Sequence, residues 1–199
     1  MTSTVIFFDG VSGIGKTTFL RYINTNFNIP VHNIRDNMDY VQKKFFTELS
    51  TDRAENMTTR LFFMETWLKV CGEIISKYES KGNSVILVDR SPVTTRLYNA
   101  DHSGVAERVV ADVLRDFELK TVLCDGVVDH VRKNKKLKKG EKVLDHFGKP
   151  CDKMLSVWRK ARPFCREWDY IFTPYIDREV KKRQLRRIGE GLGVKFYDT

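Results

Sequence analysis

Residues 10–17 read Gly10-Val11-Ser12-Gly13-Ile14-Gly15-Lys16-Thr17, and this stretch decides the fold. It fits the pattern G-x-x-x-x-G-K-[ST], which marks a loop that cradles phosphates. An apolar run at residues 4–8 precedes it and predicts a buried strand, while residues 16–27 after it predict a helix. A strand, this loop and a helix in that order form the setting in which the pattern is specific. We therefore interpret residues 10–17 as a Walker A loop that binds a nucleoside triphosphate.

The residue types of this loop explain its chemistry. Glycines let the backbone curl so that successive N–H groups point inward, and this nest and the helix N-terminus together attract phosphate oxygens. Lys16, which we expect on a solvent-facing loop, adds a positive charge near the β- and γ-phosphates, and the Thr17 hydroxyl can ligate Mg²⁺. The residues predicted to bind the ATP phosphates are Gly10, Ser12, Gly13, Ile14, Gly15, Lys16, Thr17 and Thr18.

The rest of the chain alternates apolar strands with helices. Strands are also predicted near residues 31–34, 84–88, 120–124, 170–173 and 194–197. Helices are predicted near residues 58–80, 105–117, 150–164 and 177–192, and a polar, mostly helical stretch runs to about residue 50. This alternation predicts a three-layer α/β fold, in which a parallel sheet of about five strands is covered by helices on both faces. No repeat or linker interrupts the sequence, so residues 1–199 are predicted to form a single domain.

Composition limits the classes of protein and partner. The 199 residues are 41% hydrophobic and 31% charged, which is typical of a soluble globular protein, and the net charge is +9. Such a charge favours polyanionic ligands, phosphates or nucleic acid, without choosing between them. No apolar run approaches the roughly 18 residues of a membrane span. The four cysteines show no C-x-x-C spacing, so we expect reduced thiols in a cytoplasmic protein.

The end of the strand at residues 84–88 narrows the class of nucleotide-binding protein. No Asn/Thr-Lys-x-Asp for guanine recognition is found, and the strand leads into Asp89-Arg90-Ser91-Pro92. Here the sequence resembles the P-loop nucleoside and nucleotide kinases, in the branch of the thymidylate and deoxynucleoside kinases. Thymidylate kinases carry Asp-Arg-Tyr here, followed by Ser-Ser and Tyr, at spacings that match Thr94, Thr95 and Tyr98. Deoxynucleoside kinases carry Glu-Arg-Ser, so this sequence mixes the two patterns.

Two further matches extend the resemblance, which covers roughly residues 1–150. Asp9 stands just before the loop, where the family has an acidic residue. Arg35-Asp36 stands where thymidylate kinases carry Arg-Glu-Pro, although the proline is absent. By resemblance, Arg35 would hold an acceptor phosphate and Asp36 would orient or deprotonate the acceptor oxygen, roles that suit a guanidinium and a carboxylate. The helix arginine that thymidylate kinases use near the base is missing from residues 61–67, so thymine specificity does not follow.

The resemblance implies a set of site residues, with ATP as phosphoryl donor and Mg²⁺ as its metal. The catalytic residues would be Lys16, Asp36, Arg90 and Arg132. The metal would be held by Thr17 and by Asp89, the latter directly or through water. Acceptor binding would fall to Asp9, Arg35, Arg90, Thr95 and Tyr98. To these we add Phe62, Phe63 and Trp67, which the family pattern does not contain, from the chemistry of their rings. The aromatics could stack on a nucleobase, although aromatics at helical spacing are more often core.

By resemblance to this family, in which a basic lid follows the third long strand, the lysine-rich segment 132–142 is predicted to be a mobile lid over the phosphates. Seven of its eleven residues are Arg or Lys, and like charges packed so closely repel one another, so a static compact loop is unfavourable without an anion. Arg132 is the expected direct contact, because it lies nearest the strand end. A solvated basic loop is the plainer alternative. Asp145-His146 and the basic stretch 181–187 are interpreted as structural or solvated.

These observations together indicate phosphoryl transfer from Mg·ATP to a (deoxy)nucleoside monophosphate. Three alternatives stay open. A deoxynucleoside kinase would use Asp36 as base on a 5′-hydroxyl; Ser91 favours it, whereas Arg35 and Asp89 argue against it. A polynucleotide 5′-kinase suits the net charge of +9, and a non-catalytic, nucleotide-gated nucleic-acid-binding protein suits the lysine run. Nucleic acid is the less favoured partner, no membrane partner is expected, and a homodimer is compatible with this interpretation.

Overall fold

The computed structural model describes residues 3–27, 29–38, 57–78, 84–98, 104–145, 148–174 and 178–192. The chain divides into two compact units. Unit 1 comprises Met1–Phe7 and Val31–Lys120, and unit 2 comprises Phe8–Pro30 and Thr121–Thr199. The first strand, β1 (Thr4–Asp9), gives residues to both.

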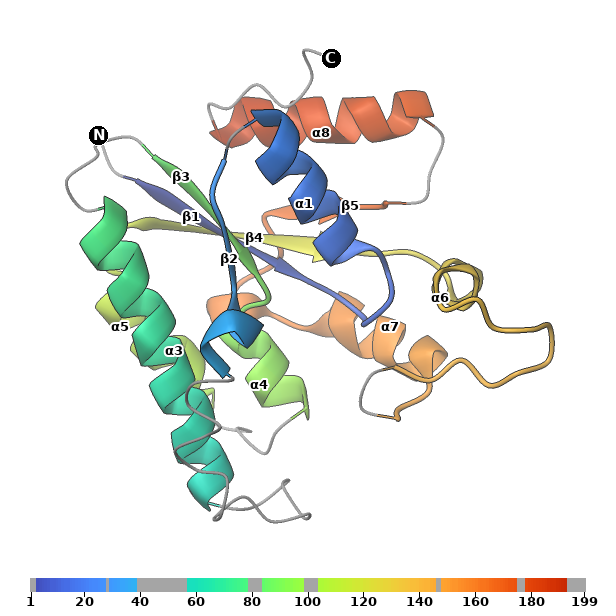
Figure 1. The fold of residues 1–199 in the computed structure, drawn as a ribbon, viewed down its shortest axis with the longest axis horizontal. Helices are drawn as coiled ribbons and strands as arrows, with labels where there is room; N and C mark the ends of the chain where they lie inside the picture. The colour runs from blue at the N-terminus through green and yellow to red at the C-terminus, as the bar shows by residue number, and fades with distance from the viewer. Residues whose placement is uncertain are drawn as a thin grey trace. The chain divides into compact units, whose positions relative to one another are not determined.

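The fold is α/β, with a parallel sheet of five strands flanked by helices (Figure 1). The strands are β1, β2 (Val31–Asn33), β3 (Val85–Asp89), β4 (Glu118–Cys124) and β5 (Tyr170–Phe172), in the order β2-β3-β1-β4-β5. Strand β2 pairs with β3 in parallel, Val31 opposite Leu87, and β4 pairs with β5, Val122 opposite Tyr170. The predicted fold class is confirmed.

Unit 1 contains β2, β3 and most of β1, with the helices α3 (Met57–Tyr78), α4 (Pro92–Tyr98) and α5 (Val105–Val113). Helix α5 packs against both α3 and α4. Residues 86–88 of β3 are fully buried, as expected for a continuous apolar strand in a parallel sheet. The Trp67 ring from α3 meets Phe7 edge-on, with ring centroids 6.3 Å apart, so α3 is fixed against the strands by its aromatic face.

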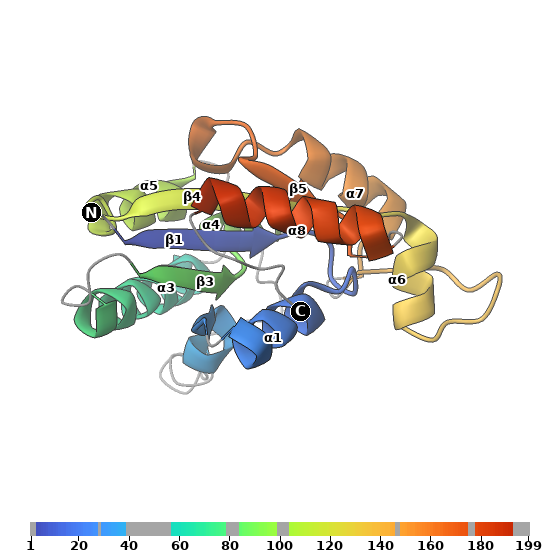
Figure 2. The same ribbon diagram turned by 90° about the horizontal axis from the view of Figure 1, so that it is seen from above.

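Unit 2 contains the loop after β1 and the helices α1 (Lys16–Phe27), α6 (Val128–Asn134), α7 (Cys151–Lys160) and α8 (Arg178–Leu192), with a 3₁₀ turn at Pro163–Cys165. Phe19 of α1 stacks on Phe172 of β5, with centroids 4.2 Å apart. Helix α8 packs on β5, and α6 packs on α7. Figures 1 and 2 show α6 following the end of β4, with the loop after it extending outward.

Most predicted elements are present, and the differences are local. Helix α5 ends at Val113 and not near residue 117. Strand β2 ends at Asn33, so Ile34 is helical and not part of the strand, whereas residues 35–38 are helical as predicted. The short helices α4 and α6 were not predicted. Helix α4 begins at Pro92, a residue suited to a first helical turn. Helix α6 lies in a highly charged stretch with too few apolar residues to show a helical period. The predicted strand at 194–197 and residues 39–50 lie outside the described residues.

Among the helices that the structure describes, none combines the length and the apolar character needed to cross a membrane. The four cysteines, all within the described ranges, are not joined by disulfides. Burial raises the pKa of the Cys71 thiol to about 12 and also raises the pKa of Cys151. These two thiols are therefore poor nucleophiles at neutral pH.

Candidate phosphate-binding loop and acceptor residues

The loop after β1, in unit 2, depends on three glycines with positive φ. Gly10, Gly13 and Gly15 have φ of 133°, 89° and 105°, values that L side chains rarely adopt. A Cβ on Gly10 would also run into the carbonyl oxygen of Cys124 at the end of β4. The curl of the loop is thus a property of the backbone, as the motif predicts.

Lys16 differs from expectation, because it is buried and not solvent-facing. Its side chain is 4% exposed, and Nζ donates to the carbonyl of Gly10 at 3.3 Å. The prediction of a solvent-facing lysine was wrong because it ignored the carbonyl oxygens that a curled loop turns toward its own lysine. The ammonium group is therefore held across the loop, at the start of α1, where the helix N-terminus adds to the positive potential.

The other predicted phosphate ligands differ in exposure. Ser12 and Thr17 are half-buried and Thr18 is exposed, whereas the side chain of Ile14 is fully buried. The Ile14 backbone N–H donates to the carbonyl of Val11 at 3.2 Å. Ile14 therefore offers its backbone to the loop, while its side chain anchors the loop in the core.

Helix α6 holds the tip of the loop, and the sequence did not predict this. The Asn134 amide donates from Nδ2 to the carbonyl of Gly13 at 2.6 Å. A Cβ built on Gly13 would lie 3.0 Å from Lys135 Cε and 3.2 Å from Val131 Cγ1. A Cβ on Gly126 would similarly lie 2.7 Å from Ile14 Cδ1. The loop and α6 are therefore in close contact within unit 2.

The lysine-rich segment begins inside α6 and is braced by its own cations. Arg132 Nη1 donates to the carbonyls of Lys138 and Glu141 at 3.0 and 2.7 Å. Lys135 Nζ donates to the carbonyl of Leu144 at 2.6 Å. These backbone acceptors allow a defined loop without a bound anion, which like-charge repulsion alone would not predict. The predicted contact of Arg132 with phosphate stays a prediction, and in this structure its guanidinium binds the loop instead.

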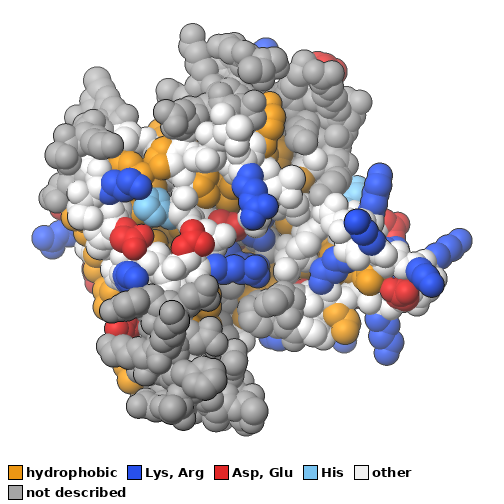
Figure 3. Space-filling model, in the orientation of Figure 1, with side chains coloured by type: hydrophobic (Ala, Val, Ile, Leu, Met, Phe, Trp, Pro, Cys, Tyr) orange, Lys and Arg blue, Asp and Glu red, His pale blue; other side chains and the backbone are white. Residues whose placement is uncertain are grey.

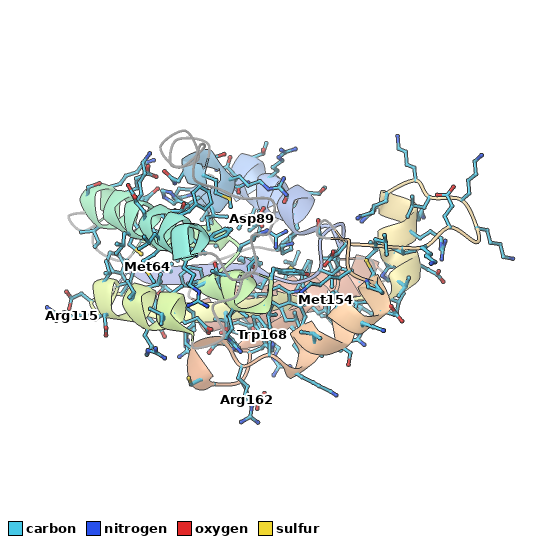
Figure 4. All side chains as sticks on the ribbon, turned by 90° about the horizontal axis from the view of Figure 1, so that it is seen from below. Met64, Asp89, Arg115, Met154, Arg162 and Trp168 are labelled. Carbon is cyan, nitrogen blue, oxygen red and sulfur yellow. The ribbon has the colours of Figure 1, made fainter. Side chains whose placement is uncertain are left out.

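Five lysines of this segment remain exposed, and they define a basic arm. Figure 3 shows Lys and Arg side chains gathered over α6 and the loop after it, and in Figure 4 these long side chains extend outward. The exposed lysines of the basic arm are Lys133, Lys136, Lys138, Lys139 and Lys142.

An ion pair at the end of β4 is a second feature that the sequence did not predict. Arg159 of α7 donates from Nε to both carboxylate oxygens of Asp125, at 3.0 and 2.9 Å, and from Nη2 to the carbonyl of Gly126 at 2.7 Å. The carboxyl ends of parallel strands are where ligands bind in α/β sheets. The pair Asp125-Gly126 directly after a strand was the sequence signal that could have drawn attention to this position.

In unit 1, Asp89 and Arg90 mark the end of β3. The Asp89 side chain is 4% exposed, and its place at the strand end can be followed in Figure 4. Arg90 has φ of 85°, an unfavourable value for a residue with a side chain. The next residue, Ser91, accepts a hydrogen bond from the Val93 N–H at 3.1 Å and caps α4. Strain of this kind is often retained where function needs it.

The predicted acceptor residues of α3 and α4 fall into two groups. Trp67 is 0% exposed, and its Nε1 donates to Thr95 Oγ1 at 3.2 Å. Trp67, Thr95 and Phe62 are buried, so in this structure they belong to the core of unit 1. Phe63 and Tyr98 keep part of their surface exposed. Of the three aromatics proposed to meet a base, Phe63 is the accessible one.

Arg35 and Asp36 lie on the helical residues 34–38 and are exposed. The side-chain oxygen of Asn33 accepts a hydrogen bond from the Arg35 N–H at 3.0 Å, which is the contact of an N-cap. This cap explains why β2 stops at Asn33 and helix begins at once. Both charged side chains are thus presented to solvent by a short, capped helical segment of unit 1.

The two residues predicted to hold Mg²⁺ belong to different units. Thr17 lies in unit 2, beside the loop, whereas Asp89 lies in unit 1 at the end of β3. Among the described residues, no group of three or more His, Cys, Asp or Glu side chains is arranged to hold a metal by itself. A Mg²⁺ ion here would need oxygens from the nucleotide, as Mg²⁺ usually does in kinases.

Comparisons with known proteins bear on the fold. No family model matches the chain, and no curated protein matches it. Solved structures do. A shikimate kinase from Bacteroides thetaiotaomicron superposes with a TM-score of 0.53 and 20% identity, over 96% of this chain and 99% of that one. The chain has the same fold as this solved structure.

Two further neighbours have the same fold. A sugar kinase from a Janibacter species has a TM-score of 0.54 and 15% identity, with 98% of this chain and 96% of that chain covered. A gluconokinase from Sinorhizobium meliloti has a TM-score of 0.53 and 14% identity, with 96% of each chain covered. Identities this low establish the fold and not the acceptor. The thymidylate kinase branch that the sequence resembles is not confirmed by these neighbours.

Proposed function

We propose that the chain is an ATP- and Mg²⁺-dependent phosphotransferase. The observation that carries the proposal is the loop of unit 2, in which three glycines at positive φ place Lys16 across the loop at the N-terminus of α1. Backbone N–H groups, a lysine and a helix N-terminus in one place are what a triphosphate requires. The kinase neighbours add support through their shared fold.

Each residue would contribute binding and charge rather than covalent chemistry. The loop N–H groups orient the β-phosphate, and Lys16 exchanges the Gly10 carbonyl for a phosphate oxygen. Thr17 and Asp89 would hold Mg²⁺, which when bound neutralises charge on the β- and γ-oxygens. Arg90 would compensate charge on the transferring group. These roles follow from the residue types and their placement at the loop and the end of β3.

For the acceptor we propose a (deoxy)nucleoside monophosphate. Arg35 supports this choice, because an exposed guanidinium on a capped segment can grip a phosphate with two parallel hydrogen bonds. Asp36 beside it would orient the acceptor oxygen, and the part-exposed ring of Phe63 would contact the base. The proposal treats residues 1–199 as one catalytic domain.

A hydroxyl acceptor is the second candidate, and the structural neighbours favour it. They are described as shikimate, sugar and gluconate kinases. A carboxylate such as Asp36 could act as general base toward a hydroxyl. Arg35 would then bind an anionic group of the acceptor other than a phosphate.

A coupled ADP-release assay tests both proposals. The acceptors are nucleoside monophosphates, nucleosides, 5′-hydroxyl oligonucleotides, shikimate and gluconate, each with Mg·ATP. We expect turnover with one or more monophosphates. Turnover should be about 10²–10³-fold lower in Lys16→Met, which keeps most of the aliphatic stem and loses the charge. Turnover confined to hydroxyl acceptors would overturn the monophosphate proposal. Failure to bind Mg·ATP in calorimetry would overturn the phosphotransferase proposal itself.

A further inference from the structure

We propose that Asn134 is a positioning residue that sets the orientation of the Gly13–Ile14 peptide in the phosphate loop. The inference rests on the proposed function, because it concerns the binding of ATP by that loop. It goes further by assigning a role to α6, an element outside the motif. The observation behind it is the 2.6 Å hydrogen bond from Asn134 Nδ2 to the carbonyl of Gly13.

A single peptide plane links this bond to the interior of the loop. The Gly13 carbonyl and the Ile14 N–H belong to the same planar trans unit, so they point in opposite directions. An outside donor that fixes the carbonyl therefore also fixes the direction of the N–H. That N–H lies on the Val11 side of the loop, where it donates to the Val11 carbonyl at 3.2 Å.

The plane needs such a constraint because glycines surround it. Gly13 has φ of 89° and Gly15 has φ of 105°, and glycine changes conformation at little steric cost. The peptide of Gly13 could therefore adopt more than one orientation in an unliganded loop. Asn134 selects one of them before ATP arrives, which lowers the ordering cost of binding.

The packing around the bond shows that Asn134 is well placed to act. A Cβ on Gly13 would lie 3.2 Å from Val131 and 3.0 Å from Lys135, so α6 contacts the loop tip on both sides of Asn134. Lys135 in turn binds the carbonyl of Leu144.

The bond is exposed, and this separates positioning from general stability. Asn134 is an exposed residue, and exposed substitutions usually change stability little. A role in positioning predicts a change in ATP affinity without a matching change in melting temperature. A merely structural role predicts that the two change together.

The test compares Asn134→Ala with a matched control. Asn24 of α1, in the same unit, donates from Nδ2 to the carbonyl of Ile29 at 2.9 Å, so Asn24→Ala removes the same kind of bond elsewhere. We expect Asn134→Ala to raise the Kd of a non-hydrolysable Mg·ATP analogue and the KM for ATP by roughly three- to tenfold, the value of one hydrogen bond. Both kcat and the KM of the acceptor should stay within about twofold. Asn24→Ala should leave the Kd unchanged.

Two conservative variants sharpen the result. Asn134→Asp keeps the shape and replaces the donor by an acceptor that repels the Gly13 carbonyl, so its Kd should exceed that of Asn134→Ala. Asn134→Gln keeps the donor on a longer side chain and should recover part of the affinity. This order of Kd values, with melting temperatures that do not follow it, is the expected signature.

Several results would overturn the inference. An Asn134→Ala Kd equal to that of the parent would do so while leaving the proposed function intact. Equal losses in Asn134→Ala and Asn24→Ala, or a loss that falls on kcat and both KM values alike, would show a structural role. A parent protein that fails to bind the analogue would remove the proposed function and this inference with it.

Discussion

The phosphate loop of unit 2 and the residues proposed to bind the acceptor, most of which lie in unit 1, are built in different ways. The loop is made by its backbone, through three glycines at positive φ and carbonyls that bind Lys16 and Asn134. The proposed acceptor residues are side chains from separate segments of the chain: Asp9 ends β1, Arg35 lies on the helical residues 34–38, and Arg90 follows β3. A loop that depends on backbone conformation needs particular residues close together in the sequence, so it forms a recognisable motif, whereas side chains scattered along the chain do not. The donor of the reaction can therefore be proposed with better support than the acceptor.

Removing the charge of Lys16 should give the largest effect. Lys16→Met loses the ammonium group that binds the Gly10 carbonyl. We expect turnover to fall by about 10²–10³-fold, the usual cost of losing one pre-placed electrostatic contact. The exposed Lys153 on α7 supplies the control, since Lys153→Met should keep full turnover. Turnover of Lys16→Met within tenfold of the parent would show that this loop does not serve a kinase.

Adding a methyl group to the loop should be the next most damaging change. Gly10→Ala meets both an unfavourable φ of 133° and the carbonyl of Cys124, whereas Gly140→Ala meets only an unfavourable φ of 95°. Strain of the backbone costs about 1–3 kcal/mol. Gly10→Ala should therefore lose more unfolding free energy than Gly140→Ala, measured by urea titration, and should also lose ATP binding. Equal losses in the two variants would show that the contact with Cys124 relaxes easily.

In unit 1, replacing Arg90 with glycine should lower turnover without lowering the unfolding free energy. Arg90→Gly removes the guanidinium but relieves a backbone at φ of 85°. We expect turnover to drop about tenfold or more, as for other charge-assisted contacts, while unfolding free energy stays level or rises by up to about 1 kcal/mol. Arg90→Ala loses the same contact and keeps the strain, so it should be the less stable of the two. A clearly destabilised Arg90→Gly would mean that the side chain, and not function, maintains this conformation.

Arg35 should affect one substrate only. Arg35→Ala removes an exposed guanidinium and should raise the KM of a monophosphate acceptor, because a lost charge-assisted hydrogen bond costs about 1.5–3 kcal/mol. The KM for ATP should not change. Arg35→Lys serves as a partial control, since it keeps the charge but not the fork of donors. If the acceptor KM is the same in all three proteins, Arg35 does not hold the acceptor.

Replacing His32 should have the smallest effect, which is a change in how the unfolding free energy depends on pH. Burial, and then Lys77, lower the pKa of His32 below 6.5, outweighing Glu73 and Asp36. Because the pKa of His32 is lower in the folded state than in the unfolded chain, the unfolded chain binds a proton more readily below pH 6.5. The unfolding free energy therefore falls as the pH drops from 6.5 toward the lowered pKa. His32→Gln should show a weaker fall between pH 7 and pH 5.5 in urea midpoints. An unchanged pH dependence would exclude His32 as its source.

The strongly patterned parts of the fold could be predicted from the sequence. The Walker A motif, the apolar run of β1 and the long periodic α3 predicted the fold class, which the structure confirms. The binding of ATP by residues 10–17 stays a prediction. The helices α4 and α6 have seven residues each, too few for a periodic signal, so they were missed. The roles of the acceptor residues stay predictions.

The contacts that shape the site were harder to predict, for physical reasons. Asn134 binds a carbonyl 121 positions earlier in the chain, and any residue supplies such an acceptor, so no residue pattern reveals the pair. Trp67 looked available for stacking because helical spacing of aromatics fits a binding face and a core face equally well. In this structure Trp67 is buried and donates to Thr95, so it packs in the core of unit 1, and its contact with a base stays a prediction.

The bonds from Arg132 and Lys135 to the carbonyls of the basic arm have a kinetic consequence. A phosphate that approaches these two cations competes with partners that are already in place, at Lys138, Glu141 and Leu144. Binding through them is therefore an exchange, and only the difference between the two sets of contacts contributes to affinity. The same carbonyls are ready to take the cations back when a phosphorylated product departs. An arm of this design would attract anions through its exposed lysines yet release them quickly, a property that favours repeated turnover over tight retention.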